Sequence, residues 1–256
     1  METVHTLASR HSRWLSNSWL VWDRPGGAAV LIDTGAPREP LLRIVAEQRL
    51  DLQWVLCTHH HHDHVEHNAA WQAEFGCPIC GHRAEAERFD VLDRTLDHGE
   101  ELRAGELVIR ALHVPGHTQG QLSFLIGERD LFTGDTLFRG SVGGTRAPGH
   151  GTFEQLRESI LGTLLALPGE TRVHPGHMES TTVAREAASN PFVLAWSRSE
   201  RPHPQRCNAL GEPAELLLLA PDYDGGTKAW VRFDDGQEDI VPGSRVVTPA
   251  DGGQRP

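Results

Sequence analysis

The stretch CTHHHHDHVEHN, residues 57–68, contains six histidines and one aspartate. Four of its side chains have the spacing H-x-H-x-D-H: His59, His61, Asp63 and His64. Alternate residues of an extended loop point to the same side, so His59 and His61 can share one ion while Asp63 and His64 turn toward a second. Neutral imidazole and carboxylate groups suit Zn²⁺, Fe or Mn²⁺. The stretch therefore predicts a metal site if distant ligands join it.

Three further candidate ligands each follow a strand-like run and lie close to a glycine, which lets backbone segments approach closely. His117 occurs in HVPGHTQG, Asp135 in LFTGDTLF and His177 in RVHPGHMES. Loops at the carboxyl ends of strands commonly build the sites of α/β proteins. We therefore expect these side chains to converge on the histidine cluster.

The elements that must position these residues alternate between strands and helices. Short apolar runs predict strands at residues 17–23, 28–35, 52–58, 106–116, 121–135 and 171–177. Apolar periodicity predicts helices at residues 37–50, 65–76 and 152–167, the last with Thr152 as N-cap. This alternation indicates the α/β class.

Composition changes near residue 200 and suggests a second unit. Residues 1–200 form the predicted main domain, and a linker rich in Pro, Arg and Ser follows it. Residues 207–250 then predict a small β appendage of three short strands. So few strands are marginally stable alone, so we expect the appendage to pack on the main domain or on a partner subunit.

Charge and hydropathy exclude several classes of protein. A net charge of −11 without a basic run disfavours nucleic-acid binding. No apolar stretch has the length of a membrane span or of a signal-peptide core, so we expect a cytoplasmic protein with no membrane partner. Cys77 and Cys80 have the CxxC spacing but lack two further soft ligands, and we interpret them as ordinary thiols.

The ordered set THHHHDH, PGHTQG, FTGDTLF and HPGH resembles the metallo-β-lactamase fold superfamily, and within it the glyoxalase II-like hydrolases. The resemblance covers about residues 14–195 and implies a four-layer αββα sandwich with the site at one edge. It implies that His59, His61 and His117 bind a first metal, that Asp63, His64 and His177 bind a second, and that Asp135 bridges both.

The resemblance further implies a binuclear metal-dependent hydrolase that cleaves a small thioester or related acyl substrate with a metal-bridging hydroxide. Zinc is the expected metal, with iron or manganese as alternatives. Asp63 and Asp135 are the expected catalytic carboxylates, Asp63 by moving a proton. The sequence leaves open whether the chain forms a homo-oligomer.

The chain departs from the glyoxalase II-like pattern in two places. Its C-terminal segment is strand-like and carries the single tyrosine, Tyr223, where glyoxalase II has a helical domain with basic and tyrosine residues. After TGDTLF the chain reads GSVGGTRAPGHGTF, whereas the family often has GSVGRTD. Arg139 and Arg146 are candidates for binding an anionic substrate, with surface salt bridges as the alternative.

Other functions remain open on the same motifs. One is a mononuclear iron persulfide dioxygenase, whose ligands would be His59, His117 and Asp135. Lactone hydrolysis is a variant of the hydrolase chemistry. A protein that keeps the fold and only binds its ligand is the third, and intact ligand positions argue against it.

Overall fold

The computed structural model describes residues 5–197 and 203–249. Its first sheet has the order β1-β2-β3-β4-β5-β6. The strands are β1 His5–Arg10, β2 Asn17–Trp22, β3 Ala28–Ile32, β4 Asp51–Leu56, β5 Ile79–His82 and β6 Arg94–Leu96. β1 to β3 are antiparallel, whereas β3 to β6 run parallel. The residues that follow β3 and β4 therefore lie at one edge of the sheet.

The second sheet has the order β14-β13-β10-β9-β8-β7. Its strands are β7 Glu101–Ala104, β8 Leu107–His113, β9 Leu122–Ile126, β10 Asp130–Gly134, β13 Arg172–Pro175 and β14 Thr181–Thr182. β10 and β13 are parallel, and β8 points the same way because two antiparallel pairings separate it from β10. The loops after β8, β10 and β13 therefore leave the same edge of this sheet.

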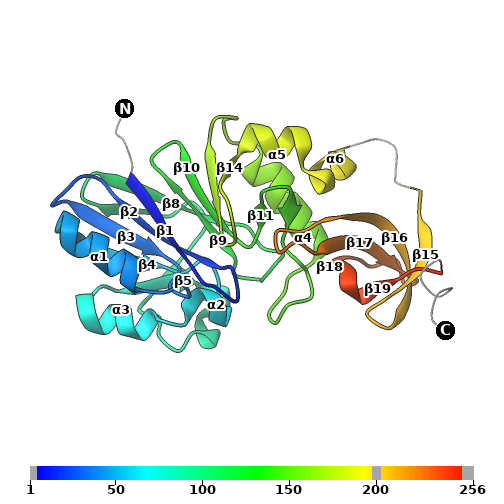
Figure 1. The fold of residues 1–256 in the computed structure, drawn as a ribbon, viewed down its shortest axis with the longest axis horizontal. Helices are drawn as coiled ribbons and strands as arrows, with labels where there is room; N and C mark the ends of the chain where they lie inside the picture. The colour runs from blue at the N-terminus through cyan, green and yellow to red at the C-terminus, as the bar shows by residue number, and fades with distance from the viewer. Residues whose placement is uncertain (1–4, 198–202, 250–256) are drawn as a thin grey trace.

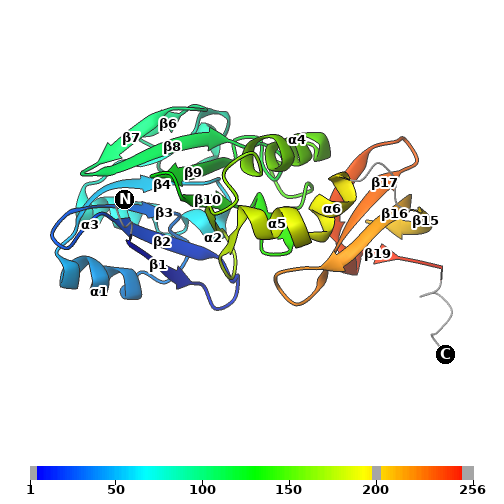
Figure 2. The same ribbon diagram turned by 90° about the horizontal axis from the view of Figure 1, so that it is seen from above.

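Helices cover the outer face of each sheet. Their bounds are α1 Glu39–Gln48, α2 His62–Val65, α3 Asn68–Phe75, α4 Phe153–Glu158, α5 Val183–Ser189 and α6 Pro191–Ser197, with 3₁₀ turns η1 Arg83–Arg88 and η3 Gly243–Arg245. Figure 2 shows the sheets as layers with α1 outside the first and α4 outside the second.

Three apolar clusters correspond to these layers. Val30 and Phe124 lie in the cluster between the sheets. Leu41 of α1 and Trp71 of α3 pack on the first sheet, and Leu156 of α4 packs on the second. The predicted α/β class and αββα sandwich are confirmed.

The helix predicted at residues 152–167 is regular only in its first part. Thr152 is the N-cap: its hydroxyl accepts a hydrogen bond from the Gln155 backbone, and the Gln155 side chain accepts one from the Thr152 backbone. After Glu158 the chain continues as a π-helical turn, η2 Ser159–Leu164, so the predicted helix extends to Leu164 but is not α-helical in its second part. Ile160 and Leu164 are still buried in the same cluster, which explains why their spacing resembled that of an α-helix.

A five-stranded C-terminal sheet, in the order β18-β17-β16-β15-β19, lies at one end of the molecule (Figure 1). Its strands are β15 Gln205–Ala209, β16 Glu212–Pro221, β17 Thr227–Phe233, β18 Glu238–Pro242 and β19 Val246–Val247. The prediction of three strands was therefore wrong. β15 begins in the segment interpreted as a linker, and it was missed because it is mostly polar and exposed and shows no apolar alternation. Residues 198–202 of that segment lie outside the described residues.

The C-terminal sheet shares its core with the main domain. Leu217, Trp230 and Ile240 belong to the same apolar cluster as Phe153 and Leu156 of α4. No helix among the described residues combines the length and the apolar character that crossing a membrane requires.

Candidate metal centre

The predicted ligands come from four loops at the facing edges of the two sheets. His59 and His61 follow β4, and His61 is the N-cap of α2, with an extended backbone. Asp63 and His64 lie on α2 itself, so this part of the cluster is helical instead of extended. The loop after β8 carries His117. Asp135 comes directly after β10 and is followed by a short hairpin of β11 Leu137–Phe138 and β12 Ser141–Val142, and His177 follows β13.

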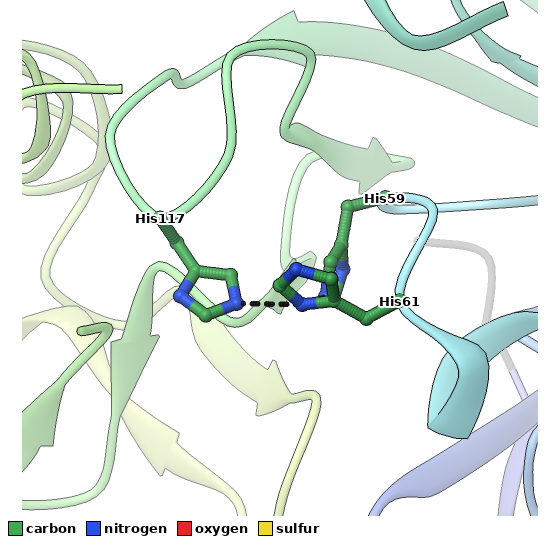
Figure 3. A group of neighbouring side chains, drawn as sticks. All are labelled: His59, His61 and His117. Carbon is green, nitrogen blue, oxygen red and sulfur yellow. Dashed lines mark hydrogen bonds between the residues drawn. The ribbon is translucent and has the colours of Figure 1, made fainter. Parts of the chain in front are cut away.

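Three imidazoles converge in the first group, as Figure 3 shows. His59 Nε2 lies 2.9 Å from His61 Nδ1, which lies 3.1 Å from His117 Nε2. The other nitrogens of His61 and His117 face the carbonyl oxygens of Pro148 and Gly144 at 2.9 and 2.8 Å. A carbonyl only accepts, so each outer nitrogen carries the proton and each inner nitrogen of these two rings presents a lone pair.

His59 has the same arrangement. Its Nδ1 lies 3.0 Å from the hydroxyl oxygen of Thr58, and that hydroxyl donates its proton to Asp33. The hydroxyl oxygen therefore accepts from Nδ1, and His59 Nε2 keeps its lone pair. Burial lowers the pKa of His59 and His61, and lowers that of His117 to about 4. The three imidazoles are therefore neutral, and no proton lies between their inner nitrogens. Lone pairs that face one another in this way fit a bound cation.

The second group consists of Asp63, His64 and His177. Asp63 Oδ2 lies 3.6 Å from Nε2 of both histidines. His64 Nδ1 lies 2.8 Å from Asp33 Oδ2, so its Nε2 is the inner atom. Burial opposes a charge on His64, but Asp135 and Asp33 outweigh it and raise the pKa of His64 to about 10. The negative field that favours a proton there also favours a cation.

Asp135 lies between the two groups. Its Oδ1 is 3.4 Å from His64 Nε2, and its Oδ2 is 3.6 Å from His117 Nε2 and 3.2 Å from His177 Nε2. Burial works to raise the pKa of Asp135, but His177 and His64 hold it well below its usual range. Asp135 Oδ1 and His64 Nε2 are buried without a well-aligned hydrogen bond to any described residue, as expected of atoms that bind a metal.

Gly176 allows the HPGH segment to lie close against Asp135 and His64. A Cβ added there would lie 2.3 Å from Asp135 Oδ1 and 2.9 Å from His64 Cε1. Contacts this short do not occur for real Cβ atoms, so a side chain at this position would displace Asp135 and the His64 ring of the second group.

Two residues that support the ligands were not predicted. Asp33, after β3, accepts hydrogen bonds from the Thr58 backbone at 2.7 Å and from the Thr58 hydroxyl at 2.8 Å, in addition to its contact with His64. Its segment LIDTG ends a strand beside a glycine, the same signal that singled out Asp135. Glu85 of η1 accepts from the backbones of His60 and Gly120 at 3.0 and 2.7 Å. Its own segment carried no such signal.

A pocket of about 620 Å³ opens beside the ligands. His117, Asp135 and Phe138 line it from the main domain, and residues 222–228 and 242–244 line it from the C-terminal sheet. The Tyr223 ring stacks on His177 with centroids 4.5 Å apart and planes at 17°. The C-terminal sheet thus forms part of the candidate site.

The two arginines predicted to bind substrate do not line this pocket. Arg139 is exposed. Arg146 forms an ion pair with Asp239 at 2.6 Å and lies over the Phe233 ring, so it joins the two parts of the chain. A substrate-binding role for these residues stays a prediction without support from the geometry.

The cysteines stand apart from the metal ligands. All four are free, and none belongs to a candidate metal group among the described residues. Burial raises the pKa of Cys77, and raises that of Cys80 to about 12, which keeps both as unreactive thiols at neutral pH.

Comparisons with known proteins identify the family of the chain. The model of the metallo-beta-lactamase superfamily matches residues 11–177. Hydroxyacylglutathione hydrolase GloC of Haemophilus influenzae is 35% identical over 197 residues, covering 69% of this chain and 92% of that protein. Among solved structures, ETHE1 from Myxococcus xanthus is 33% identical with a TM-score of 0.67, covering 74% of this chain and 84% of its own. TTHA1623 in a di-iron-bound form is 35% identical with a TM-score of 0.60, covering 73% and 99%. The chain belongs to the metallo-β-lactamase superfamily.

Proposed function

We propose that the protein is a binuclear metal-dependent hydrolase of small thioesters or related acyl compounds. The observation that carries the proposal is the position of Asp135, whose two oxygens lie within 3.6 Å of ligand nitrogens in both groups. A relative named hydroxyacylglutathione hydrolase and a relative solved in a di-iron-bound form support it.

Each group of side chains has a defined part in this function. His59, His61 and His117 would hold one ion, Asp63, His64 and His177 the other, and Asp135 would bind both. A pair of divalent cations supplies an activated water and polarises an acyl carbonyl. Zinc is the metal that we propose first, with iron and manganese as alternatives that the same ligands accept.

The carboxylate of Asp63 would accept and return a proton during the reaction. Its side chain is 22% exposed against 9% for Asp135, so it is the more accessible of the two carboxylates. A thiolate leaving group has a low proton affinity, so a thioester needs little help from a general acid.

Metal analysis combined with a thioester assay tests this proposal. The wild-type protein should hold two ions per chain and hydrolyse a simple thioester, and Asp135→Ala should lose both properties together. Full turnover in that variant would refute the assignment.

A mononuclear iron persulfide dioxygenase is the second candidate, because His59, His117 and Asp135 alone would suffice for it. The convergence of Asp63, His64 and His177 on a separate position favours the binuclear hydrolase. One iron per chain with oxygen uptake on a persulfide would decide for the dioxygenase.

A further inference from the structure

The 222–228 loop, which comprises the turn between β16 and β17 and the first two residues of β17, forms a pocket wall that the C-terminal sheet contributes beside the metal ligands. The family match ends at residue 177, so this wall lies outside it. The match to TTHA1623 spans 99% of that protein but only 73% of this chain. About a quarter of this chain therefore has no counterpart there. Substrate selection by this loop would therefore be a property that this chain has beyond the shared fold.

The only lysine and the only tyrosine of the chain both lie in this loop. Lys228 is the single lysine among 24 lysine and arginine residues, and Tyr223 is the single tyrosine. Lys228 is only 6% exposed and still lines the pocket. Lysine is rarely buried to this degree unless it is paired.

The lysine ammonium is partly satisfied by protein groups. It donates to the Val142 carbonyl at 2.6 Å and pairs with Asp222 Oδ2 at 3.1 Å. These are its only polar partners among the described residues, and an ammonium has three N–H donors. One donor is therefore left for a group that enters the pocket.

The charges around Lys228 select the kind of group that it can bind. Asp222 neutralises the ammonium, and Ser141 holds Asp222 in place with a hydrogen bond of 2.7 Å. Asp224 adds a carboxylate at the pocket, and it has no ion-pair partner in the described part of the chain. Among Asp222, Asp224 and Lys228 the net charge is negative, so an anionic group placed beside Lys228 would be repelled by these residues, whereas a neutral carbonyl oxygen would meet only a donor.

Aromatic rings complete the surface next to this donor. Lys228 Nζ lies 5.1 Å from the centroid of Phe138 and 5.2 Å from that of Tyr223, and these two rings are 4.7 Å apart. A short uncharged chain with one amide would fit both the rings and the donor.

We infer that the loop of residues 222–228 is a substrate-binding wall, and that Lys228 donates its third N–H to a neutral carbonyl, such as an amide, in the thiol portion of the substrate. This inference rests on the proposed thioesterase function. Lys228 is a binding and positioning residue, because it contacts substrate away from the scissile bond.

Kinetics with a matched pair of thioesters tests the inference. S-acetyl-N-acetylcysteamine carries a neutral amide, and S-acetyl-3-mercaptopropionate carries a carboxylate at a similar distance from sulfur. The wild-type enzyme should prefer the amide by kcat/KM. Lys228→Met should raise KM for the amide about tenfold or more, the effect of one charge-assisted hydrogen bond, with kcat and metal content little changed.

Arg206→Met is the matched control, because it also replaces a cation of the C-terminal sheet with methionine. Arg206 pairs with Asp234 on the surface, where its side chain is 61% exposed, and it is not part of the pocket lining. Its kinetics should equal those of the wild type. An unchanged KM in Lys228→Met, or a wild-type preference for the carboxylate, would overturn the inference.

A binding measurement separates this inference from the proposed function. Protein labelled with ¹³C at lysine Cε gives one lysine resonance, because the chain has one lysine. A non-hydrolysable thioether ketone built on N-acetylcysteamine should shift that resonance. A shift without thioester turnover would overturn the proposed function and keep the binding wall. Turnover without a shift would keep the proposed function and overturn the binding wall.

Discussion

The imidazole tautomers of the metal centre are set by residues that themselves lie outside the ligand groups. Thr58 and the carbonyls of Gly144 and Pro148 hold the outer nitrogens of three histidines, and Asp33 holds that of His64. The ligand residues therefore provide lone pairs only because a second set of hydrogen bonds directs them.

Asp33→Asn tests this control of tautomers. In the variant one side-chain oxygen can still accept from the Thr58 backbone. The amide NH₂, however, would face the hydroxyl of Thr58 and Nδ1 of His64, and both of these groups donate to Asp33 in the wild type. His64 should change to the tautomer with a proton on Nε2 and lose its inner lone pair. We expect the affinity for the second ion to fall about 10–100-fold, as measured by competition with a chelator. Equal affinities in variant and wild type would contradict this role.

His82 should make the stability of the protein depend on pH. Its ring stacks on that of His113 with centroids 4.0 Å apart, and burial and His113 lower the pKa of His82 to about 4, although Asp97 and Glu85 act in the opposite sense. The unfolded chain binds this proton near the ordinary pKa of 6.5, so it binds more protons than the folded chain between these values. Stability contributed by neutral His82 is therefore present above pH 6.5 and is lost as the pH falls toward 4.

His82→Asn removes this titration and keeps the helix cap. The side chain of His82 accepts a hydrogen bond from the Ala84 backbone, and asparagine is a good N-cap acceptor. The drop in Tm between pH 7 and pH 5 should be smaller in the variant than in the wild type. An equal drop in both proteins would show that His82 does not titrate as described.

At the scale of elements, Glu85 joins the loop that carries the histidine cluster to the loop after β8. It accepts from the His60 and Gly120 backbones, and His60 Nδ1 lies 2.8 Å from its Oε2. Both loops deliver ligands to the first metal group. The relative position of His59 and His117 therefore depends on a carboxylate from a third element, η1.

Glu85→Ala should loosen both loops. Two backbone N–H groups would lose their acceptors in a protein interior, which costs about 1–3 kcal/mol each. We expect a lower free energy of unfolding, by about 2–6 kcal/mol, and weaker binding of the first metal. Urea denaturation and metal titration measure these effects. Glu128→Ala removes an exposed glutamate and should change neither, and equal behaviour of the two variants would argue against the role of Glu85.

The sequence was informative where an element has its own local signal. Each ligand loop follows a strong apolar run, and those of His117, Asp135 and His177 also lie close to a glycine, so their convergence with His59 could be predicted. Asp33 shows the same signal, but it holds the outer nitrogen of His64 and is not itself in a ligand group. Only the three-dimensional structure shows which of these residues face the metal position and which lie behind them. Glu85 acts through contacts between distant segments, and β15 is held by pairing with β16, so neither has a local pattern.

At the scale of the whole molecule, the C-terminal sheet is attached through polar contacts and a shared core. Thr145 donates to Asp239 at 2.9 Å and accepts from the Ile240 backbone at 2.8 Å. Trp230 stacks on Phe153 of α4 with centroids 5.5 Å apart. Because the same sheet carries residues 222–228 and 242–244 of the pocket lining, anything that loosens the sheet should alter the candidate site.

Trp230→Ala tests whether the two parts of the chain unfold together. Trp230 is 8% exposed. In addition to Phe153, it contacts Trp196 of α6 edge-on, with ring centroids 6.4 Å apart. Removal of a buried tryptophan costs about 3–5 kcal/mol. Because the cluster spans α4, α6 and the C-terminal sheet, that loss should lower the Tm of a single calorimetric transition by roughly 6–20 °C. Two transitions, of which only the smaller moves, would mean that the C-terminal sheet unfolds on its own and that the shared core contributes little to the stability of the main domain.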